Sequence, residues 1–516
     1  MLMSRLDQGF KNIIYGLGNS VLGSILGFIG RTVFIYKLGE TYLGLSGLLN
    51  NVFGMLTISE LGISTAIGFS LYKPLAEKDY DSISSLMSLY RKAYMIIGSF
   101  VLISGIVIYP FLDFFISTDE QPYGITYAYF LFLINIVLGY FVSYKTTLIS
   151  SDNRAFEIVP ISAVITLIQT ILQICYLLIF SDYFGYLTIQ IVCTVVIAIL
   201  QNRYITKKYV QVDFYSSKKL NQTQKQIIKR NIGGLIIAKI GDYLVNSTDN
   251  LIITKMVSLV ATGLYSNYLL IRNIVNGYIA AIFSGITAGM GNVVAKEGKE
   301  KKIQVFNNMF FCAFLIYSFE ASCFMCLFNS FIGDIWIGWK YTFSNATVAV
   351  IVLNNFLTGL RMPIITMKNA AGVYMEDAWV PFGFSIVNLV VSIVLAQYIG
   401  ISGVFVGTII GSLCTADWYR PMVIYKNVFQ TSVKEYFKKY IIYIICGILE
   451  VILAFSLCNL VFIDNKYINF LVEAFISICI PVIINCIVFR KTYEFICVCE
   501  MLKKLLVQYS ANIKRR

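Results

Sequence analysis

The stretch GNSVLGSILGFIGRTVFIYK, residues 18–37, decides the class of fold, because apolar and small residues fill it around a single internal charge, Arg31. A helix crosses the roughly 30 Å hydrocarbon core of a membrane with about 20 residues, so this stretch is long enough to span it. Similar apolar runs recur along all 516 residues, of which 58% are hydrophobic and only 13% are charged. Soluble domains carry about 25% charged residues. The sequence therefore predicts an all-α integral membrane protein.

Fourteen segments of the chain are long and apolar enough to cross a membrane as helices. We expect these spans at residues 12–36, 44–72, 92–116, 124–149, 156–180, 184–204, 233–256, 261–294, 304–331, 343–368, 379–398, 401–425, 440–462 and 467–489.

The basic residues predict the orientation of these spans. With the N-terminus inside, the external joins hold only Lys37, Lys255, Lys340 and Lys466. Three further basic residues lie within spans, and the rest of the 41 Lys and Arg fall in cytoplasmic segments. This bias is the positive-inside pattern of membrane proteins. It places both termini in the cytoplasm, and it accounts for the net charge of +13 without any binding of nucleic acid.

The longest polar break between spans predicts a cytoplasmic linker between two helical lobes. We expect an N-terminal lobe at 1–204, the linker at 205–232, a C-terminal lobe at 233–426, and two further spans with a cytoplasmic tail at 427–516. A weak internal repeat supports this division. KLGETYLGLSGLLN (37–50) and KMVSLVATGLYSNYLL (255–270) each place a Lys, a short polar turn and a Gly-Leu pair before the next helix. Parallel repeats of this kind are a known transporter architecture.

Four predicted spans, at equivalent places in the two halves, each carry one polar face with ionisable groups, since residues three and four apart share a helix face. The candidate site residues on these faces are Arg31, Asn50, Glu60, Lys239, Asp242, Asp249, Tyr265, Tyr268, Arg272 and Asn276. A central Arg, Lys or Asp costs about 2.5–3.5 kcal/mol to insert, and intramembrane charges usually line an interior or a wet cavity. The pattern therefore predicts a polar cavity that the four helices share.

The two arginines are the candidates for binding an anionic substrate, because a guanidinium group holds phosphate oxygens in a planar, bidentate way. Two interpretations stay open for the other residues. Lys239 and Asp242 lie one turn apart, so they either neutralise each other or have a role of their own. Glu60 either pairs with an arginine or has a role of its own, and Tyr265 and Tyr268 either pack in the protein or stack on sugars.

Several kinds of chemistry are not indicated by the sequence. It contains no His, the commonest metal ligand and proton switch. Its twelve Cys are scattered and mostly lie in apolar segments, as expected of small apolar residues. Neither a GxxxxGK[ST] nucleotide loop nor an HExxH or GxSxG motif occurs. We therefore expect no metal, no cofactor and no catalytic site, and transport driven by an ion gradient or the membrane potential.

Two stretches carry a resemblance to a known family: FIGRTVFIYKLGETYLGLSGLLNNVFGMLTISELGISTAIGFSLYKPLAEKD (28–79) and GDYLVNSTDNLIITKMVSLVATGLYSNYLLIRN (241–273). The chain resembles the polysaccharide-transporter branch of the multidrug/oligosaccharidyl-lipid/polysaccharide exporter superfamily. These proteins are bacterial flippases for lipid-linked oligosaccharides. The resemblance implies two six-helix bundles around a central cavity that opens to either side in turn, plus two C-terminal helices that accommodate a lipid tail.

The resemblance also implies a function and its partners. We expect the chain to carry polyprenyl-diphosphate-linked oligosaccharides across the bacterial cytoplasmic membrane for surface polysaccharide assembly, alongside a glycan polymerase and other assembly proteins. By position, Arg31 and Arg272 match the cationic residues that hold the substrate diphosphate in related flippases, with Asn and Tyr side chains against the sugars. Asp242 and Asp249 both match an acidic residue that couples ion flow in some relatives.

Two other functions compete with this interpretation. An exporter of cationic drugs with a similar fold would prefer an acidic cavity, whereas here Arg31, Lys239 and Arg272 offset Glu60 and two aspartates. A membrane glycan polymerase or ligase typically presents a large external catalytic loop, and every predicted external join in this sequence is short. The flippase is therefore the favoured prediction.

Overall fold

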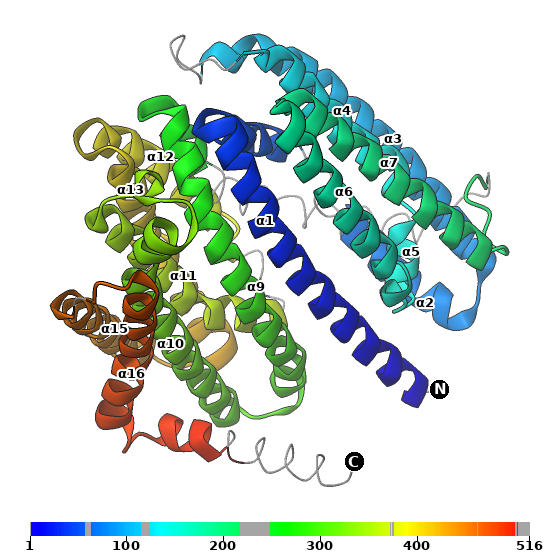
Figure 1. Ribbon diagram of the computed structural model, residues 1–516. Coiled ribbons are helices and arrows are strands. Elements are labelled where there is room, and N and C mark those ends of the chain that lie inside the picture. The colour runs from blue at the N-terminus through cyan, green and yellow to red at the C-terminus, as the bar shows by residue number, and fades with distance from the viewer. Residues whose placement is uncertain are drawn as a thin grey trace, which may run out of the picture. The chain divides into compact units, whose positions relative to one another are not determined.

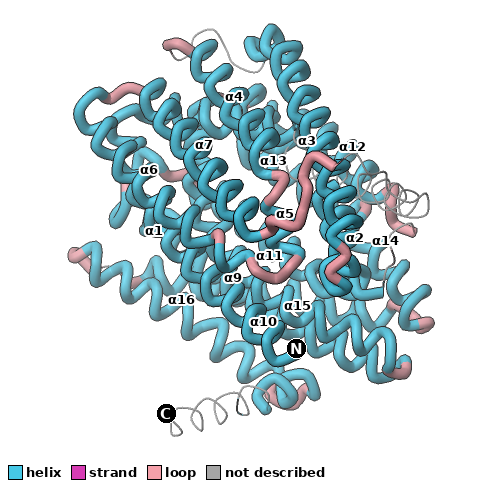
Figure 2. The backbone as a smooth tube through the Cα atoms, turned by 90° about the vertical axis from the view of Figure 1, so that its right-hand side faces the viewer, coloured by secondary structure: helices cyan, strands magenta, loops and turns pink. Residues whose placement is uncertain are grey.

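The computed structural model describes residues 2–56, 63–114, 123–216, 248–371, 373, 376–461, 463–500 and 503. Every regular element in this part of the chain is a helix, and Figure 2 shows helices joined by short loops. The chain divides into two compact units, Met1–Ser266 and Asn267–Arg516. The predicted all-α membrane fold is confirmed.

The first unit begins with α1 (Leu2–Leu56), which consists of two helices that meet at a kink and covers the first predicted span and the start of the second. Gly39 bends it, with φ 81° and ψ −176°, where the first external join was expected. A positive φ of this size costs glycine nothing because it has no Cβ. The other helices are α2 (Ile63–Glu77), α3 (Tyr80–Ile108), α4 (Ile125–Ser143), α5 (Thr146–Ser151), α6 (Val159–Phe180) and α7 (Tyr183–Lys208).

Capping side chains determine where two of these helices begin. Asp79 accepts a hydrogen bond from the backbone N–H of Ser82 at the start of α3. Asp182 accepts from the N–H groups of Phe184 and Gly185 at the start of α7.

Within the unit, α1 lies along α6, α6 packs against α7, and α4 lies between α3 and α7 (Figure 1).

The second unit contains most of α9 (Leu259–Lys296), whose first two turns belong to the first unit. Its other α-helices are α10 (Lys299–Ser330), α11 (Asn345–Ala371), α12 (Val380–Ile399), α13 (Ile401–Cys414), α14 (Ala416–Ile424), α15 (Lys434–Leu460) and α16 (Lys466–Phe489). Helix α10 is the core of this unit, because it packs against α11, α15 and α16 and is the most buried of the membrane-length helices.

Helices α12 and α13 approach each other so closely that their backbones touch. A Cβ atom at Gly403 would lie 2.4 Å from the carbonyl oxygen of Leu395, and one at Gly407 would lie 2.6 Å from the backbone nitrogen of Ser392. Gly411 lies against Asn388 in the same way. Glycines four residues apart let helices in membranes pack at short distance. The GVFVGTIIG pattern at 403–411 therefore serves helix packing, as its spacing predicts.

Ten described helical segments are long and apolar enough to cross a membrane, and Ile125–Phe141 is a shorter apolar helix. This number is roughly consistent with fourteen spans, because the seventh predicted span lies mostly outside the described residues and the second is divided by residues 57–62. Large apolar side chains on the outer faces of α3, α6, α12, α15 and α16 are exposed. A bilayer would cover such faces, so the chain is a multi-pass membrane protein.

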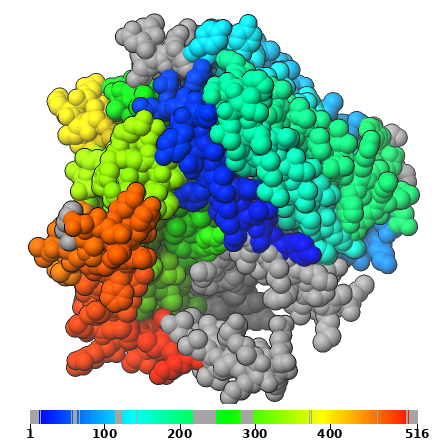
Figure 3. Space-filling model, in the orientation of Figure 1, coloured from blue at the N-terminus to red at the C-terminus, as the bar shows by residue number. Residues whose placement is uncertain are grey.

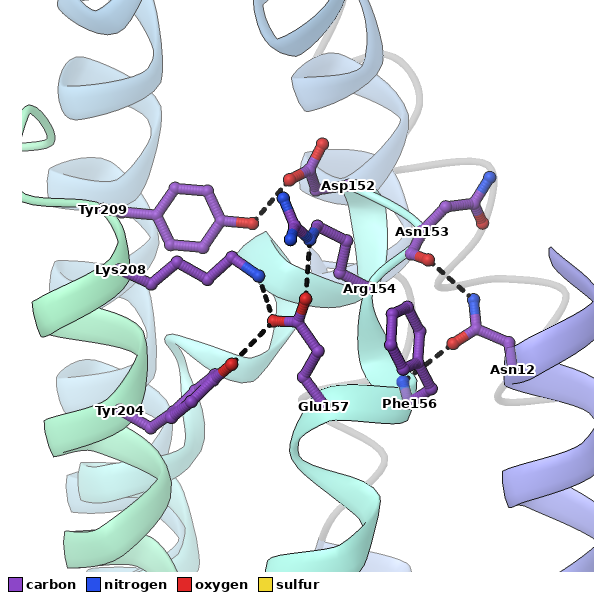
Figure 4. A network of polar contacts seen from close by, with 9 residues as sticks. All are labelled: Asn12, Asp152, Asn153, Arg154, Phe156, Glu157, Tyr204, Lys208 and Tyr209. Atoms are coloured by element: carbon purple, nitrogen blue, oxygen red, sulfur yellow. Dashed lines mark hydrogen bonds and ion pairs between the residues drawn. The ribbon is translucent and has the colours of Figure 1, made fainter. Parts of the chain in front are cut away.

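A polar network fixes the chain around the start of α6 (Figure 4). Glu157 accepts hydrogen bonds from Arg154 Nε at 2.8 Å, from Tyr204 Oη at 3.0 Å and from the Lys208 ammonium group of α7. Asn12 of α1 donates to the carbonyl oxygen of Asn153 at 2.8 Å and accepts from the backbone N–H of Phe156, three residues before α6. The network therefore joins α1, α6 and α7 at one end of the first unit.

Candidate functional site

Arg31 lies on α1 and is half-buried in the first unit. Its guanidinium group donates a hydrogen bond to the hydroxyl of Ser266, near the start of α9. Ser266 in turn donates to the carbonyl oxygen of Gly263 at 2.5 Å. Tyr186 of α7 also interacts electrostatically with Arg31. Arg31, which the sequence predicts to bind an anion, thus lies among hydroxyl groups.

The contact of Arg31 with Ser266 depends on a close approach of α1 and α9. A Cβ atom at Gly44 would lie 2.1 Å from the carbonyl oxygen of Leu259, and one at Gly263 would lie 2.9 Å from the backbone nitrogen of Gly44. These two glycines occupy equivalent places in the two copies of the sequence repeat. The structure therefore brings the repeated segments into direct contact through the residues that define them.

The other candidates in the first unit lie in different surroundings. Asn50 is exposed, and its amide donates to the carbonyl oxygen of Ser46 in its own helix at 2.8 Å. Tyr265 is buried. Asp249 is half-buried, next to Asn250, whose amide donates to Asn51 of α1 at 3.2 Å. Glu60, Lys239 and Asp242 lie outside the described residues.

Arg272 lies on α9 in the second unit, and its Nε is buried with no hydrogen-bond partner in the described part of the chain. Glu320 of α10 interacts electrostatically with it. Asn276, one turn along α9, donates from its amide to Oδ1 of Asn355 on α11 at 3.0 Å. Asn355 lies beside Glu320 as well. Three helices thus contribute one arginine, one carboxyl group and two amides to a single polar cluster.

Glu320 is a member of this cluster that our sequence reasoning missed. It is only 3% exposed, and neither carboxyl oxygen has a hydrogen bond of normal geometry from the described residues. The signal was present, because Glu320 is the one charge in the apolar run FFCAFLIYSFEASCFMCLF at 310–328. A charge inside a membrane span indicates a candidate functional residue, and this holds for Glu320 as it does for Arg31.

Tyr268 is 1% exposed, and its hydroxyl group has two partners in the second unit. It donates to Oδ1 of Asn329 at 2.6 Å and accepts from the backbone N–H of Phe343 at 2.8 Å. Its ring stacks on Phe343, with the ring centroids 5.2 Å apart. These contacts give Tyr268 a structural role in the present conformation.

The two clusters can bind an anion but lack the groups that hold a metal. Among the described residues, no three Asp, Glu, Cys or His side chains gather in an arrangement that could hold a metal ion. Each cluster instead offers one guanidinium group with amide or hydroxyl neighbours, and the cluster around Arg272 also contains the Glu320 carboxyl group. Partial burial strengthens the interaction of such a cation with phosphate or carboxylate, because less water screens it.

Solved membrane transporters share this fold. A structure titled lipid II flippase MurJ in an inward closed conformation matches 93% of this chain and 99% of its own, with 14% identity and a TM-score of 0.65. An inward-facing multidrug-resistance MATE transporter matches 83% of this chain and 99% of its own, with 14% identity and a TM-score of 0.61. A point mutant of the MATE transporter VcmN of Vibrio cholerae matches 84% and 98%, with 13% identity and a TM-score of 0.54. The chain therefore has the fold of MOP-superfamily membrane transporters.

The family of the chain follows from its sequence. A search of curated protein sequences found no match. The family model described as "Polysaccharide biosynthesis protein" matches residues 10–287, which is more than half of the chain. The chain belongs to this family.

Proposed function

We propose that the protein is a flippase for polyprenyl-diphosphate-linked oligosaccharides. It moves them across the bacterial cytoplasmic membrane to supply surface polysaccharide assembly, such as capsule, O-antigen-like glycan or teichoic acid. The family supports the link to polysaccharide, and the shared fold with a flippase supports translocation. Arg272 is the observation that carries the proposal, since its buried Nε has no hydrogen-bond partner among the described residues.

The physical argument starts from the cost of an arginine inside a membrane, about 2.5–3.5 kcal/mol on insertion scales. A buried donor without a partner adds about 1–3 kcal/mol. A diphosphate headgroup offsets both costs, because phosphate oxygens accept two parallel bonds from one guanidinium group. Glu320 supplies a counter-charge beside Arg272 when no substrate is bound. Arg31, which is bonded to a neutral hydroxyl, is the second phosphate ligand.

The remaining candidates complete the proposed cycle. The lipid tail stays in the bilayer while the sugars pass Asn50, Tyr265, Tyr268 and Asn276. Glu60, Lys239, Asp242 and Asp249 balance charge or couple ion flow. No covalent bond forms or breaks, so the proposed activity is not enzymatic. A glycan polymerase would then use the delivered units.

The double variant Arg31→Ala with Arg272→Ala tests the proposal. We expect it to abolish export of the glycan and to stop translocation of lipid-linked oligosaccharide in proteoliposomes, with normal amounts of protein in the membrane. The matched control is Arg203→Ala, because Arg203 is exposed near the end of α7 and its loss should change neither. The Arg31→Lys, Arg272→Lys pair keeps the charges but loses the bidentate geometry, so partial activity is expected. Normal export by the double alanine variant would refute the proposal.

The buried carboxyl group of Glu320 favours a second candidate function, the export of cationic drugs, because an acid in a cavity attracts cations. A strain that overproduces the protein would then become resistant to cationic compounds, and Glu320→Gln would remove the resistance. Unchanged drug sensitivity together with restored glycan export would exclude this candidate.

A further inference from the structure

The second unit contains another polar site, where α10, α15 and α16 meet. Its centre is Glu450, near the middle of α15 in the apolar run IICGILEVILAF at 444–455. Glu450 is 0% exposed. None of the ion pairs formed by the described residues includes it. A carboxyl group is therefore buried at the centre of a membrane-length helix without a cationic partner in this part of the chain.

Side chains from both neighbouring helices lie beside the Glu450 carboxyl group: Ser318 of α10 and Asn485 of α16, which are themselves buried. Both oxygens of Glu450 and Oδ1 of Asn485 lack a hydrogen-bond donor of normal geometry among the described residues. The Ser318 hydroxyl is engaged elsewhere, since it donates to the carbonyl oxygen of Leu315 at 3.4 Å. Three acceptor oxygens thus lie together, and none of them has a hydrogen bond of normal geometry from the described residues.

This site is separate from the cluster around Arg272. Ser318 and Glu320 are two residues apart on α10, and 3.6 residues make one turn, so they point to nearly opposite sides of the helix. Glu320 lies toward Arg272 and Asn355, whereas Ser318 lies toward Glu450. Cys446, on the same helix as Glu450, is a titratable group that interacts with it in the described part of the chain. A thiol is neutral near pH 7, so it supplies no counter-charge.

The outer faces of α15 and α16 separate this site from the surroundings of the protein. Ile445, Ile448 and Leu449 are exposed on α15, and Leu471 and Val482 are exposed on α16. The two helices lie side by side, and both contribute to the surface that Figure 3 shows in orange and red. Lipid would cover these apolar residues, so ionised Glu450 would lie in a region of low dielectric constant. The neutral acid is the form that such a site holds.

We propose that Glu450, with Ser318 and Asn485, forms a proton-binding site that couples the movement of substrate to the proton gradient; this coupling role rests on the proposed transport function. In the present conformation the O–H group of the carboxylic acid donates a hydrogen bond to Oδ1 of Asn485, which gives that oxygen a donor. When water enters the interface of α10, α15 and α16, the O–H bond of Glu450 breaks and the proton passes to water. The carboxylate that remains is then hydrated. No oxidant or reductant takes part.

The choice of an acid at this position supports a role for the proton. Glutamine has the same shape, donates hydrogen bonds to the same neighbours and carries no risk of a buried charge. Glutamate differs from it mainly in its ability to release and rebind a proton. Since one pH unit changes the ratio of acid to carboxylate about tenfold, a gradient of that size can bias the cycle by a similar factor.

Infrared spectroscopy of the full chain in lipid nanodiscs tests proton binding without any substrate. We expect the wild-type protein at neutral pH to show a neutral carboxylic acid band that is lost in Glu450→Gln and that decreases as the pH is raised. The control is Glu494→Gln, because Glu494 forms an ion pair with Lys439 at 2.6 Å and its loss should leave the acid band unchanged. A spectrum in which Glu450→Gln removes no acid band would overturn the proposal.

Transport in proteoliposomes tests coupling. With a gradient of about one pH unit, we expect wild-type translocation to accelerate by up to about tenfold. Glu450→Gln should keep the rate measured without a gradient and lose the acceleration, whereas Glu494→Gln should keep both. Asn485→Leu is the second variant to measure if Glu450→Gln fails to fold, and we expect it to reduce the acceleration. An acceleration that survives in both Glu450→Gln and Asn485→Leu contradicts coupling through Glu450.

If the wild-type protein moves no lipid-linked oligosaccharide, the proposed function fails, but the infrared measurement still decides whether Glu450 binds a proton.

Discussion

At the scale of single residues, the buried polar groups of this protein fall into two classes. Tyr268 represents the first class, because its hydroxyl group both donates and accepts a hydrogen bond within the second unit. Arg272 and Glu450 represent the second class, since each has a buried atom that lacks a hydrogen bond in the described part of the chain. The first class stabilises one conformation. The second class keeps a hydrogen-bonding atom that a substrate or a proton can use.

Removing the hydroxyl group of Tyr268 should lower stability. Tyr268→Phe leaves Asn329 Oδ1 and the Phe343 N–H without a partner, and a buried group left in this state costs about 1–3 kcal/mol. We expect a lower thermal unfolding temperature in detergent, with little change in the apparent affinity for substrate. Tyr398→Phe is the control, because Tyr398 is exposed on α12. Unchanged stability with weaker substrate binding would instead support the sugar-contact role of Tyr268.

At the scale of elements, most helix bounds follow from hydrophobic pattern and capping. Helix α16 (Lys466–Phe489) nearly coincides with the predicted span at 467–489, and α12 (Val380–Ile399) with that at 379–398. The first two predicted spans meet at Gly39, whose non-helical φ and ψ separate two helices within α1. The polar turn in the sequence therefore indicates the break correctly.

The close approach of α1 and α9 predicts that Gly44 cannot be enlarged. A Cβ atom there meets the backbone of Leu259, which has no flexible end that could move away, so the two helices must separate. We expect Gly44→Ala to lower stability in detergent by about 1–3 kcal/mol, the usual cost of overpacking. Gly23→Ala on α1 is the control, since no atom lies within 4 Å of its added Cβ. Equal stability of the two variants would contradict the packing of α1 on α9.

The network around Glu157 predicts a stabilising link between α6 and α7. Glu157→Ala leaves three donors without their acceptor, and hydrogen bonds to charged groups are worth about 1.5–3 kcal/mol. The expected loss of stability lies toward the lower end, because Arg154 is partly exposed to solvent. The control is Glu77→Ala, which removes the exposed ion pair of Glu77 with Lys73. A loss in Glu157→Ala no greater than in this control would show that the network does not stabilise the fold.

At the scale of the whole molecule, the predicted orientation can be tested with thiol reagents. In a variant without the native cysteines, we expect a membrane-impermeant maleimide to label Asp464→Cys in intact cells. Ser432→Cys should react only after the membrane is made permeable. Asp464 lies between α15 and α16, and Ser432 lies just before α15, so the two positions are at opposite ends of one helix. The reverse pattern would place the termini outside.

The sequence predicted the class of protein and the helices better than it predicted the site. Composition and span length require an all-α membrane fold, since a bilayer leaves few other solutions for the backbone. Charge within a span also indicated Arg31 and Arg272. Glu320 could have been found by the same rule, but its pairing with Arg272 and that of Ser266 with Arg31 could not be predicted, because contacts between distant segments depend on how helices rotate and pack. The cavity that we expect between the lobes and the assignments of Glu60, Lys239 and Asp242 stay predictions.

The contact between α12 and α13 has a practical consequence for watching the transport cycle. Because Gly403 and Gly407 seat one backbone directly on the other, sliding of either helix would force heavy atoms into overlap. We therefore expect α12 and α13 to move as one rigid body throughout the transport cycle. A spin label or fluorophore attached to either helix would report the displacement of both, and the distance between two labels placed across the pair offers a fixed internal ruler against which the movements of other helices can be calibrated.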